Sequence, residues 1–390
     1  MALEGLKKKL LVILFSAAVV LQAHGVTVRE IEVEGLNKTN PERFMKLLEW
    51  YKGKEADTEA VTETILRTGI FETPETEVTE EGTLRIKVKE KFSFLPIPFA
   101  SASSGTYMGG LVIMDNNAFG LMNSLAAGGF FSDSSYSFFA GYSHRQGADE
   151  PFGWQFAVNS GKTDAETENE YGTVLHRYSG TKYGISGGIS CRPLPGIRLG
   201  TKAGYRTFDG EPSVPVSVSA SAGKSSWNGI FMNTSSLDIT AEHSFGSEDR
   251  SFSSITVKGL WEQPLPGRLR LTAEAGWFHA PDIPPEYAES PSVTGISLLG
   301  SRYKVSSAAS CSAGLEWCAL NLPFGMLTLY GQYQLAYLEN VTYGETPAHG
   351  PVAGIRFYLK KIAFPAINIY TSYNADTGNL RTSAGAGFSF

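Results

Sequence analysis

The feature that most constrains this chain is the pattern of its sequence from Gly105 to Phe390. Segments of about ten residues alternate apolar with polar or small side chains, and turn residues separate the segments. No stretch of this region has the 3.6-residue period of an amphipathic helix. Because successive side chains of a β-strand point to opposite faces, this alternation predicts strands with one apolar and one polar face. The region is therefore expected to form an antiparallel β-sheet.

Four segments show the two faces most clearly: "IRLGTKAGYR", "RLRLTAEAGW", "LTLYGQYQLAYL" and "INIYTSY". In the first, Leu199 and Tyr205 lie on the face opposite Lys202. A soluble β-sandwich also alternates in this way. However, aromatic residues near the ends of an apolar face are typical of a transmembrane barrel, whose closed sheet leaves no edge in lipid. Aromatic residues in such positions include Trp277, Trp317, Tyr337 and Tyr373.

The number of strands can be estimated from the same pattern. About fourteen segments are convincing strands, and residues 162–180 and 212–228 are ambiguous but leave room for two more. The predicted fold class is therefore mainly β, with a transmembrane antiparallel barrel of about 16 strands in residues 105–390.

Residues 1–25 have the pattern of a secretory signal peptide. Three lysines, Lys7, Lys8 and Lys9, precede an apolar run that ends at Leu21, and Ala23-x-Gly25 then forms a small-residue cleavage pattern. A membrane anchor is the alternative, but the run is shorter than the roughly 20 residues that span a bilayer. We expect export with cleavage after Gly25. No Cys stands at the cleavage site, so a lipoprotein is not expected.

Charge and cysteine content exclude two further classes of protein. The chain has a formal net charge of -6, and loss of three Lys and one Glu with residues 1–25 lowers it to about -8, so no basic nucleic-acid surface is expected. Three cysteines are an odd number for an exported protein. Cys311 and Cys318 lie seven residues apart in one predicted strand, on opposite faces and too far apart to pair. Free thiols are therefore expected.

Residues 26–92 have a different organisation, with predicted elements in the order strand, helix, helix, strand, strand. "VTVREIEVEGL" alternates as a half-buried strand does, and two helices are predicted to follow, with Asn40 and Asp57 as their N-caps. "TPETEVTEEGTLRIKVKEK" predicts two strands around a turn at Gly82. With "IEVEGL", "LRTGIF" and "LRIKVKEK", this α+β segment resembles a POTRA domain. An unrelated small α+β domain is the alternative, and residues 93–104 are expected to form a linker.

A POTRA domain followed by a barrel of this length resembles the BamA/TamA-type superfamily of outer-membrane assembly and secretion proteins, the surface-antigen barrels. "GGLVIMDNNAFGLMNSL" is similar to the opening strand and turn of that barrel, with Asp115, Asn117 and Gly120 in the places of its aspartate, asparagine and glycine. The long segment "PDIPPEYAESPSVTGISLLGSRYK" precedes five predicted strands, as the inward-folded loop of the family does.

The inward loop of the family carries a (Val/Ile/Leu)-Arg-Gly-(Phe/Tyr) motif, whose Arg reaches a lumenal carboxylate. In the best register Gly300 matches the glycine, but Leu299 replaces the Arg and Ser301 replaces the aromatic residue. Gln332 stands where the carboxylate is expected. The absence of both the Arg and its carboxylate is chemically consistent, because a buried carboxylate without its cation costs several kcal/mol.

A substitute for the missing ion pair is predicted nearby. Arg302 and Tyr303 follow the motif closely, and parity places Glu316 in the lumen. The hypothesis is that these two residues dock the loop on Glu316. The alternative is that Arg302 is a solvated loop residue.

No motif of an enzyme, a metal site or a cofactor site is present: the chain lacks G-x-S-x-G, H-E-x-x-H and Cys/His metal spacing. No catalytic residue is therefore assigned. The predicted lumen has a charge bias that would attract anions or anionic segments, unless the charges neutralise one another. Its cations are Arg198, Lys202, Arg206, Lys258, Arg268, Arg270, Arg356 and Lys360, against Asp238, Glu242, Glu274 and Glu316.

The resemblance implies a protein of the bacterial outer membrane that helps membrane proteins insert or passes polypeptide across, with its POTRA domain in the periplasm. Implied partners are lipid, unfolded outer-membrane or secreted polypeptides and assembly proteins of the periplasm or outer membrane. Clients would dock on the POTRA sheet edge. The first strand, near residues 106–114, and the last, Arg381 to Phe390, would meet at a weak seam. The alternative is a channel or structural barrel that its POTRA domain only anchors.

The chain ends in "RTSAGAGFSF". Ser383, Gly385, Phe388 and Phe390 fit a polar-x-Gly-x-x-apolar-x-apolar pattern that resembles the sorting signal of bacterial outer-membrane barrels. The resemblance implies that these residues anchor the last strand at the membrane interface and direct the chain to assembly.

Overall fold

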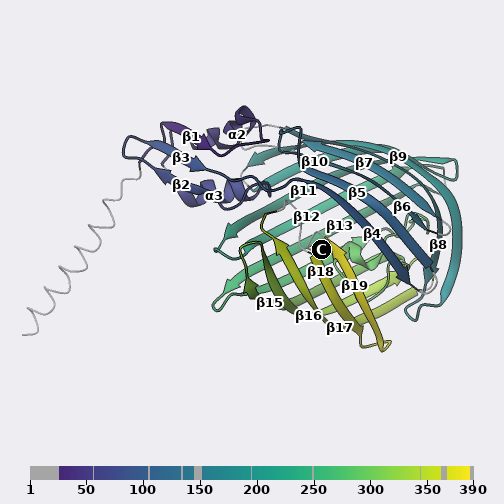
Figure 1. The fold of residues 1–390 in the computed structure, drawn as a ribbon. Helices are drawn as coiled ribbons and strands as arrows, with labels where there is room; N and C mark the ends of the chain where they lie inside the picture. The colour runs from purple at the N-terminus through teal and green to yellow at the C-terminus, as the bar shows by residue number, and fades with distance from the viewer. Residues whose placement is uncertain are drawn as a thin grey trace, which may run out of the picture.

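The computed structural model describes residues 26–55, 57–103, 106–132, 135–144, 152–194, 196–247, 250–342, 344–361 and 367–386. The expected signal peptide, residues 1–25, lies outside this set. A small α+β domain precedes a large sheet that curls into a barrel (Figure 1). Among the described residues, none of the helices has the length and apolarity needed to cross a bilayer.

The small N-terminal domain has the predicted order of elements. These are β1 Glu30–Glu34, α2 Pro41–Leu48, the 3-10 helix η1 Glu49–Tyr51, α3 Thr58–Leu66, β2 Glu75–Val78 and β3 Thr83–Lys87. The sheet order is β1-β3-β2, with β1 parallel and β2 antiparallel to the central β3. Both helices begin at the predicted residues. The Asn40 side chain caps α2 by accepting from the N–H of Arg43, and the Asp57 side chain caps α3 by accepting from the N–H of Ala60.

A compact apolar core explains the stability of this domain. Phe44 and Leu48 of α2 and Ile65 of α3 are fully buried. They pack on the inner face of the sheet, where Leu84 and Ile86 of β3 are 1% and 2% exposed. The helical and strand periods of the sequence therefore place their apolar faces against each other, as predicted.

The rest of the chain forms one 16-stranded sheet in which each strand pairs with its neighbours in sequence. The strands are β4 Phe94–Ser103, β5 Thr106–Ala118, β6 Asn123–Ser132, β7 Tyr136–His144, β8 Phe152–Glu168, β9 Val174–Leu194, β10 Ile197–Phe208, β11 Glu211–Trp227, β12 Met232–Phe245, β13 Phe252–Leu265, β14 Leu269–His279, β15 Val305–Asn321, β16 Gly325–Asn340, β17 Gly344–Leu359, β18 Ile367–Asn374 and β19 Asn379–Ala386. The predicted strand number is confirmed, and the ambiguous residues 162–180 and 212–228 lie in or between β8, β9 and β11.

The start of the barrel differs from the prediction. Residues 94–103, expected as a linker, form β4, which pairs with β5 from Phe94↔Asp115 to Ser103↔Thr106. Residues 106–114, expected as the first strand, therefore belong to the second. The two prolines Pro96 and Pro98 suggested a linker, but proline is tolerated on an edge strand, whose outer side has no ladder to donate to.

The outer face of the barrel is apolar, as the alternation predicted. Leu199, Tyr205, Trp277 and Tyr337 are 43%, 48%, 42% and 52% exposed. Cys311 and Cys318 lie on opposite faces of β15, one exposed and one buried, and the described structure leaves all three cysteines unpaired.

The two ends of the sheet are β4 and β19, and both lie on the near side of the barrel in Figure 1. Over the described residues no ladder joins these two strands. Ser383 and Gly385 of the expected sorting signal pair with Tyr370 and Asn368 of β18. Phe388 and Phe390 lie outside the described residues.

Candidate functional site

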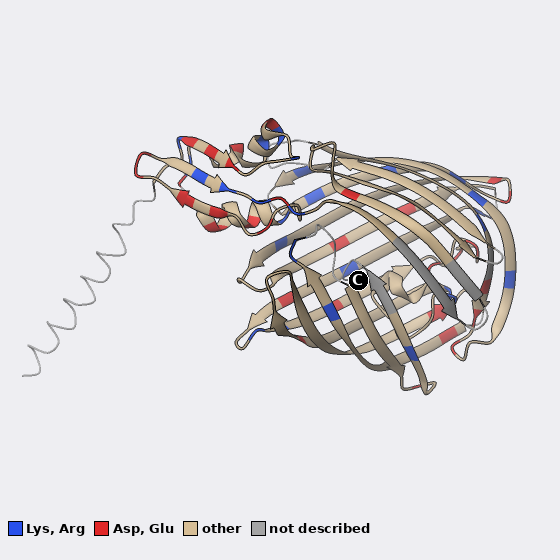
Figure 2. Cartoon of the chain, in the orientation of Figure 1, with Lys and Arg blue, Asp and Glu red and all other residues tan. Residues whose placement is uncertain are grey.

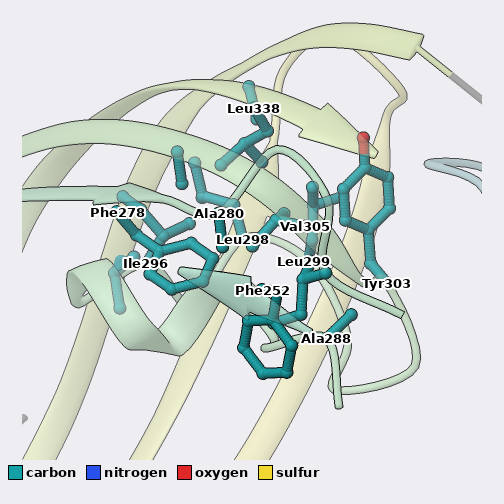
Figure 3. Close-up of a cluster of buried hydrophobic side chains, with 14 residues drawn as sticks. Phe252, Phe278, Ala280, Ala288, Ile296, Leu298, Leu299, Tyr303, Val305 and Leu338 are labelled. Carbon is teal, nitrogen blue, oxygen red and sulfur yellow. The ribbon is translucent and has the colours of Figure 1, made fainter. Parts of the chain in front are cut away.

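The connection between β14 and β15 packs inside the barrel. It contains the short 3-10 helix η3 Pro291–Thr294, and its apolar side chains join a buried cluster from the inner faces of five strands. Figure 3 shows Leu298, Leu299 and Tyr303 gathered with Phe278 and Leu338 of the wall. The remaining labelled members are Phe252, Ala280, Ala288, Ile296 and Val305. The loop therefore fills the part of the lumen enclosed by β13 to β17.

Two residues of the barrel wall, Gln334 and Ser372, hydrogen-bond to the backbone of this loop around Ser297. Gln334 of β16 is 1% exposed, and its Oε1 accepts hydrogen bonds from the N–H and the hydroxyl of Ser297, at 3.0 and 3.1 Å. Its Nε2 donates to the carbonyl of Gly295 at 3.4 Å. Ser372 of β18 donates to the carbonyl of Ser297 at 2.9 Å. The family resemblance placed Gln332 at the position of the carboxylate, but Gln332 is only half-buried. Gln334 lies two residues later on the same face of β16, and its bond to the loop was not predicted.

The loop also reaches the last strand of the barrel. A Cβ atom on Gly300 would lie 2.5 Å from Nη1 of Arg381 in β19, so a side chain at this position requires the guanidinium to move. Leu299 and Tyr303 beside it are 7% and 1% exposed and belong to the buried cluster. The glycine of the loop motif thus permits close contact with an Arg of β19.

The proposed contact of Arg302 with Glu316 is wrong. Arg302 Nη1 lies 3.1 Å from carboxylate oxygens of both Glu166 and Glu168 at the end of β8, and its side chain is 51% exposed. Glu316 lies eleven residues beyond Val305 in β15, which is about 36 Å along a strand. The side chain of Arg302, which lies three residues before Val305, cannot span that distance.

Glu316 instead lies in a buried network of its own. Its carboxylate accepts hydrogen bonds from Arg270 at 2.6 Å, Arg356 at 2.8 Å and the Tyr358 hydroxyl at 2.9 Å, and it is 1% exposed. Arg270 also pairs with Glu262 at 2.7 Å. Glu316 therefore neutralises Arg270 and Arg356, two of the cations that were predicted to line the lumen.

The residues predicted as the first-strand turn connect the barrel to the N-terminal domain. Asp115 accepts two hydrogen bonds from Lys38 Nζ, at 2.9 and 2.8 Å, and one from the Ser93 hydroxyl at 2.8 Å. Asn117 Nδ2 donates to the Thr39 hydroxyl at 2.8 Å, and both side chains are buried. The predicted turn is present, since the Gly120 N–H donates to the Asn117 carbonyl at 3.0 Å, and the side chains of Asp115 and Asn117 also bond across the domain boundary.

Gly120 completes this joint through its backbone. Its φ is +73°, its carbonyl accepts from the N–H of Asn40 at 2.8 Å, and a Cβ atom there would lie 2.3 Å from the carbonyl oxygen of Lys38. A left-handed conformation and close backbone contact both favour glycine. The joint therefore requires glycine at position 120.

Glu90 orders the segment of the N-terminal domain that enters the joint. Its carboxylate accepts hydrogen bonds from the N–H groups of Asn37, Lys38 and Thr39, at 2.9, 3.0 and 2.9 Å. Burial by itself raises the pKa of Glu90, but these backbone donors hold the pKa below its ordinary value.

A second contact lies across the mouth of the barrel, where α3 touches the end of β11. Glu63 Oε1 accepts from the N–H of Trp227 at 2.9 Å, and Arg67 Nη2 donates to the carbonyl of Ser225 at 2.8 Å. The N-terminal domain is therefore attached to the barrel at two separate places.

A cavity of about 1160 Å³ lies between these two attachments, bounded by α2, α3 and the inner ends of the strands near them. Its basic lining residues are Arg43, Arg67, Arg192, Arg198, Lys202 and Lys224. Asp238 is the one acidic residue in the described lining. In Figure 2 the outer part of the small domain carries many acidic positions, while Lys and Arg appear on the strands beside it.

The described residues hold no metal-binding group: no three His, Cys, Asp or Glu side chains among them come together as a metal site.

No protein-family model matches the sequence, and a search of curated proteins found no match. The fold is similar to three solved structures at 14% sequence identity. CdiB from Escherichia coli aligns with a TM-score of 0.63 over 93% of this chain and 75% of that chain. CdiB from Acinetobacter baumannii aligns with a TM-score of 0.56, over 91% and 72%.

The third structure is BamA from Haemophilus ducreyi lacking POTRA domains 1-3, with a TM-score of 0.51 over 93% of this chain and 85% of that chain. The predicted architecture, a POTRA-like domain followed by a BamA-type barrel of 16 strands, is therefore confirmed at the level of the fold.

Proposed function

We propose that this chain is a barrel of the bacterial outer membrane that assists insertion of membrane proteins or passes polypeptide across, with its N-terminal domain in the periplasm. The observation that carries the proposal is the pair of strands, β4 and β19, at which the sheet ends without a ladder between them in the described structure. A sheet edge facing lipid leaves backbone N–H and C=O groups unpaired, and each costs several kcal/mol. Such an edge favours addition of a client strand.

The first strand is poor at closing the barrel. β4 carries Pro96 and Pro98, which have no N–H to donate. A seam with fewer donors costs less to open than a junction whose two strands pair along a full ladder.

The N-terminal domain offers a second place for a client. β1 and β2 are the outer strands of its three-stranded sheet, and each pairs only with β3 in the described structure. An extended segment can add to such an edge through backbone hydrogen bonds, without a defined sequence.

The rival function is a channel or a structural barrel. The observation that favours a channel is the cavity at the mouth, because the loop that fills the lumen near β13 to β17 leaves this space open. A channel needs no movement of the seam.

A disulfide across the seam separates the two functions. The chain is first freed of Cys191, Cys311 and Cys318 by Ser substitution. Cys pairs are then scanned between β4 (residues 94–103) and β19 (residues 379–386), with the start of β4 opposite the end of β19. We expect a cross-linked pair to stop assembly of other outer-membrane barrels, or secretion, and a reductant to restore it. The matched control is Leu199→Cys with Ala220→Cys, which are register partners on β10 and β11.

The rival functions differ in what the locked protein does. Full activity after complete seam cross-linking would falsify the assembly proposal, and unchanged ion conductance would then support a channel. Depletion is the second measurement: if the amounts of all other outer-membrane barrels and secreted proteins are unchanged without this protein, the assembly function is excluded.

A further inference from the structure

The cavity between the N-terminal domain and the barrel gathers positive charge from two separate domains. Arg67 directly follows α3, Arg192 lies in β9 and Arg198 lies in β10. All three line this one cavity, although they come from separate elements. This arrangement is notable in a chain whose formal net charge is -6. Clustered like charges repel one another, and a bound anion relieves that repulsion.

Four cations of the cavity have no carboxylate within salt-bridge distance in the described part of the chain. These are Arg192, Arg198, Lys202 and Lys224. Elsewhere in the lumen, Arg206, Arg270 and Arg356 each have a Glu partner. The lumenal charge bias is therefore neutralised near Glu316 and left uncompensated at the cavity.

Small polar residues lie between these cations on the part of the cavity wall formed by β9, β10 and β11, whereas Leu47, Trp50, Met122 and Trp154 line other parts. Arg198 is in register with Ser221, and Gly200 is in register with Ser190 and Ser219 on its two sides. Lys202 is in register with Gly188. Glycine and serine leave space beside the wall, and hydroxyl groups can donate to or accept from the backbone of an extended chain.

We propose that this cavity binds acidic segments of an extended polypeptide. Guanidinium forks match carboxylates in bidentate geometry, and the cavity lies between the proposed docking domain and the lumen. A lipid phosphate shares this anion chemistry, and the competition experiment below distinguishes it from a polypeptide carboxylate. The source of the polypeptide rests on the proposed function, whereas the anion chemistry of the site does not.

The test measures binding of a labelled, disordered peptide of alternating Glu and Ser to the full chain in detergent micelles. We expect this peptide to bind, and added salt to weaken binding. A matched peptide of alternating Gln and Ser is expected not to bind. The variant Arg192→Gln with Arg198→Gln should weaken binding of the acidic peptide by about tenfold or more.

The matched control is Arg177→Gln, which removes one cation from the same strand but outside the cavity. It should leave the affinity unchanged. Heat-dependent mobility on gels shows whether each variant is folded. Equal binding of the Gln and Glu peptides, or equal loss of affinity with Arg177→Gln, overturns the proposal.

Two further arms separate the alternatives. Short-chain phosphatidic acid and inorganic pyrophosphate are used as competitors, and the polypeptide assignment is wrong if either binds more tightly than the acidic peptide through Arg192 and Arg198. If the peptide does not bind but a cross-linked seam still stops assembly, this inference fails and the proposed function stands. If it binds as expected while a cross-linked seam has no effect, the proposed function fails and the anion site stands.

Discussion

At the scale of single residues, two side chains that both point into the lumen have different binding partners. Gln334 and Glu316 both point inward from neighbouring strands and both are 1% exposed. Gln334 bonds to the backbone of the loop, whereas Glu316 bonds to two Arg side chains of the wall. The sequence placed both in the lumen, but the partner of each depends on how far along its strand it lies.

Gln334→Ala is expected to loosen the loop. It leaves the Ser297 N–H and the Gly295 carbonyl without their partner, and a buried unpaired polar group costs about 1–3 kcal/mol. We expect faster protease cleavage within residues 281–304 and a lower unfolding temperature in detergent. Gln332→Ala on the same strand serves as the control, and equal effects of the two substitutions would contradict the assigned role of Gln334.

Glu316→Gln and Arg302→Ala are expected to act independently. Loss of the Glu316 charge leaves Arg270 and Arg356 buried without it, which costs about 3–5 kcal/mol. Arg302 is half-exposed, so its ion pairs contribute at most about 1 kcal/mol. The measurement is a double-mutant cycle on the free energy of unfolding. A coupling energy near zero is expected, and a large one would restore the contact that the structure excludes.

At the scale of elements, the informative feature is the joint between β5 and the N-terminal domain. Lys38, Asp115 and Asn117 form its side-chain bonds, and Gly120 forms the close backbone contact. The joint fixes the domain at one side of the mouth, and α3 fixes it at the other. These two contacts together create the basic cavity.

Gly120→Ala is expected to release one side of the domain. The added methyl group meets the Lys38 carbonyl at 2.3 Å, in a φ region that disfavours alanine. The distance distribution between spin labels on α2 and on β7 should broaden, while the barrel keeps its heat-dependent gel mobility. Gly210→Ala is a suitable control, since its φ is +84° but nothing lies within 4 Å of the added atom. An unchanged distribution for Gly120→Ala would show that the joint is not required.

Glu90 gives the joint a dependence on pH. Its pKa is lowered in the folded state by three backbone donors, so the stabilisation is complete above the unfolded pKa of about 4.3 and is lost as the pH falls through the folded value. The difference in urea midpoint between the unmodified chain and Glu90→Gln should be largest at neutral pH and shrink below about pH 4. A difference that does not depend on pH would exclude this role.

At the scale of the whole molecule, the last residues are predicted to direct assembly of the barrel. The sequence places Phe390 on the lipid face and Ser389 on the lumenal face of the final strand. Phe390→Asp is expected to leave export intact but to prevent membrane assembly, because it puts a charge at the proposed interfacial anchor. Ser389→Asp adds the same charge on the other face and should be tolerated. Cell fractionation and heat-dependent gel mobility measure both, and normal assembly of Phe390→Asp would contradict the proposed sorting signal.

What the sequence determined by itself is the part of the structure that follows from local periodicity. Alternation placed Leu199, Trp277 and Tyr337 on the outer face, and helical spacing and capping residues placed α2 and α3. These features depend on side chains a few residues apart, so they can be recognised without knowledge of the fold.

Only the tertiary structure decided which distant residues meet. The edge position of β4 makes Pro96 and Pro98 acceptable in a strand, and strand length keeps Arg302 away from Glu316. Arg67 and Arg192 are 125 residues apart in sequence and line one cavity. Such contacts depend on strand register and on where the small domain docks, and local sequence encodes neither. The side chains could therefore be assigned to a face from the sequence, but their partners could not.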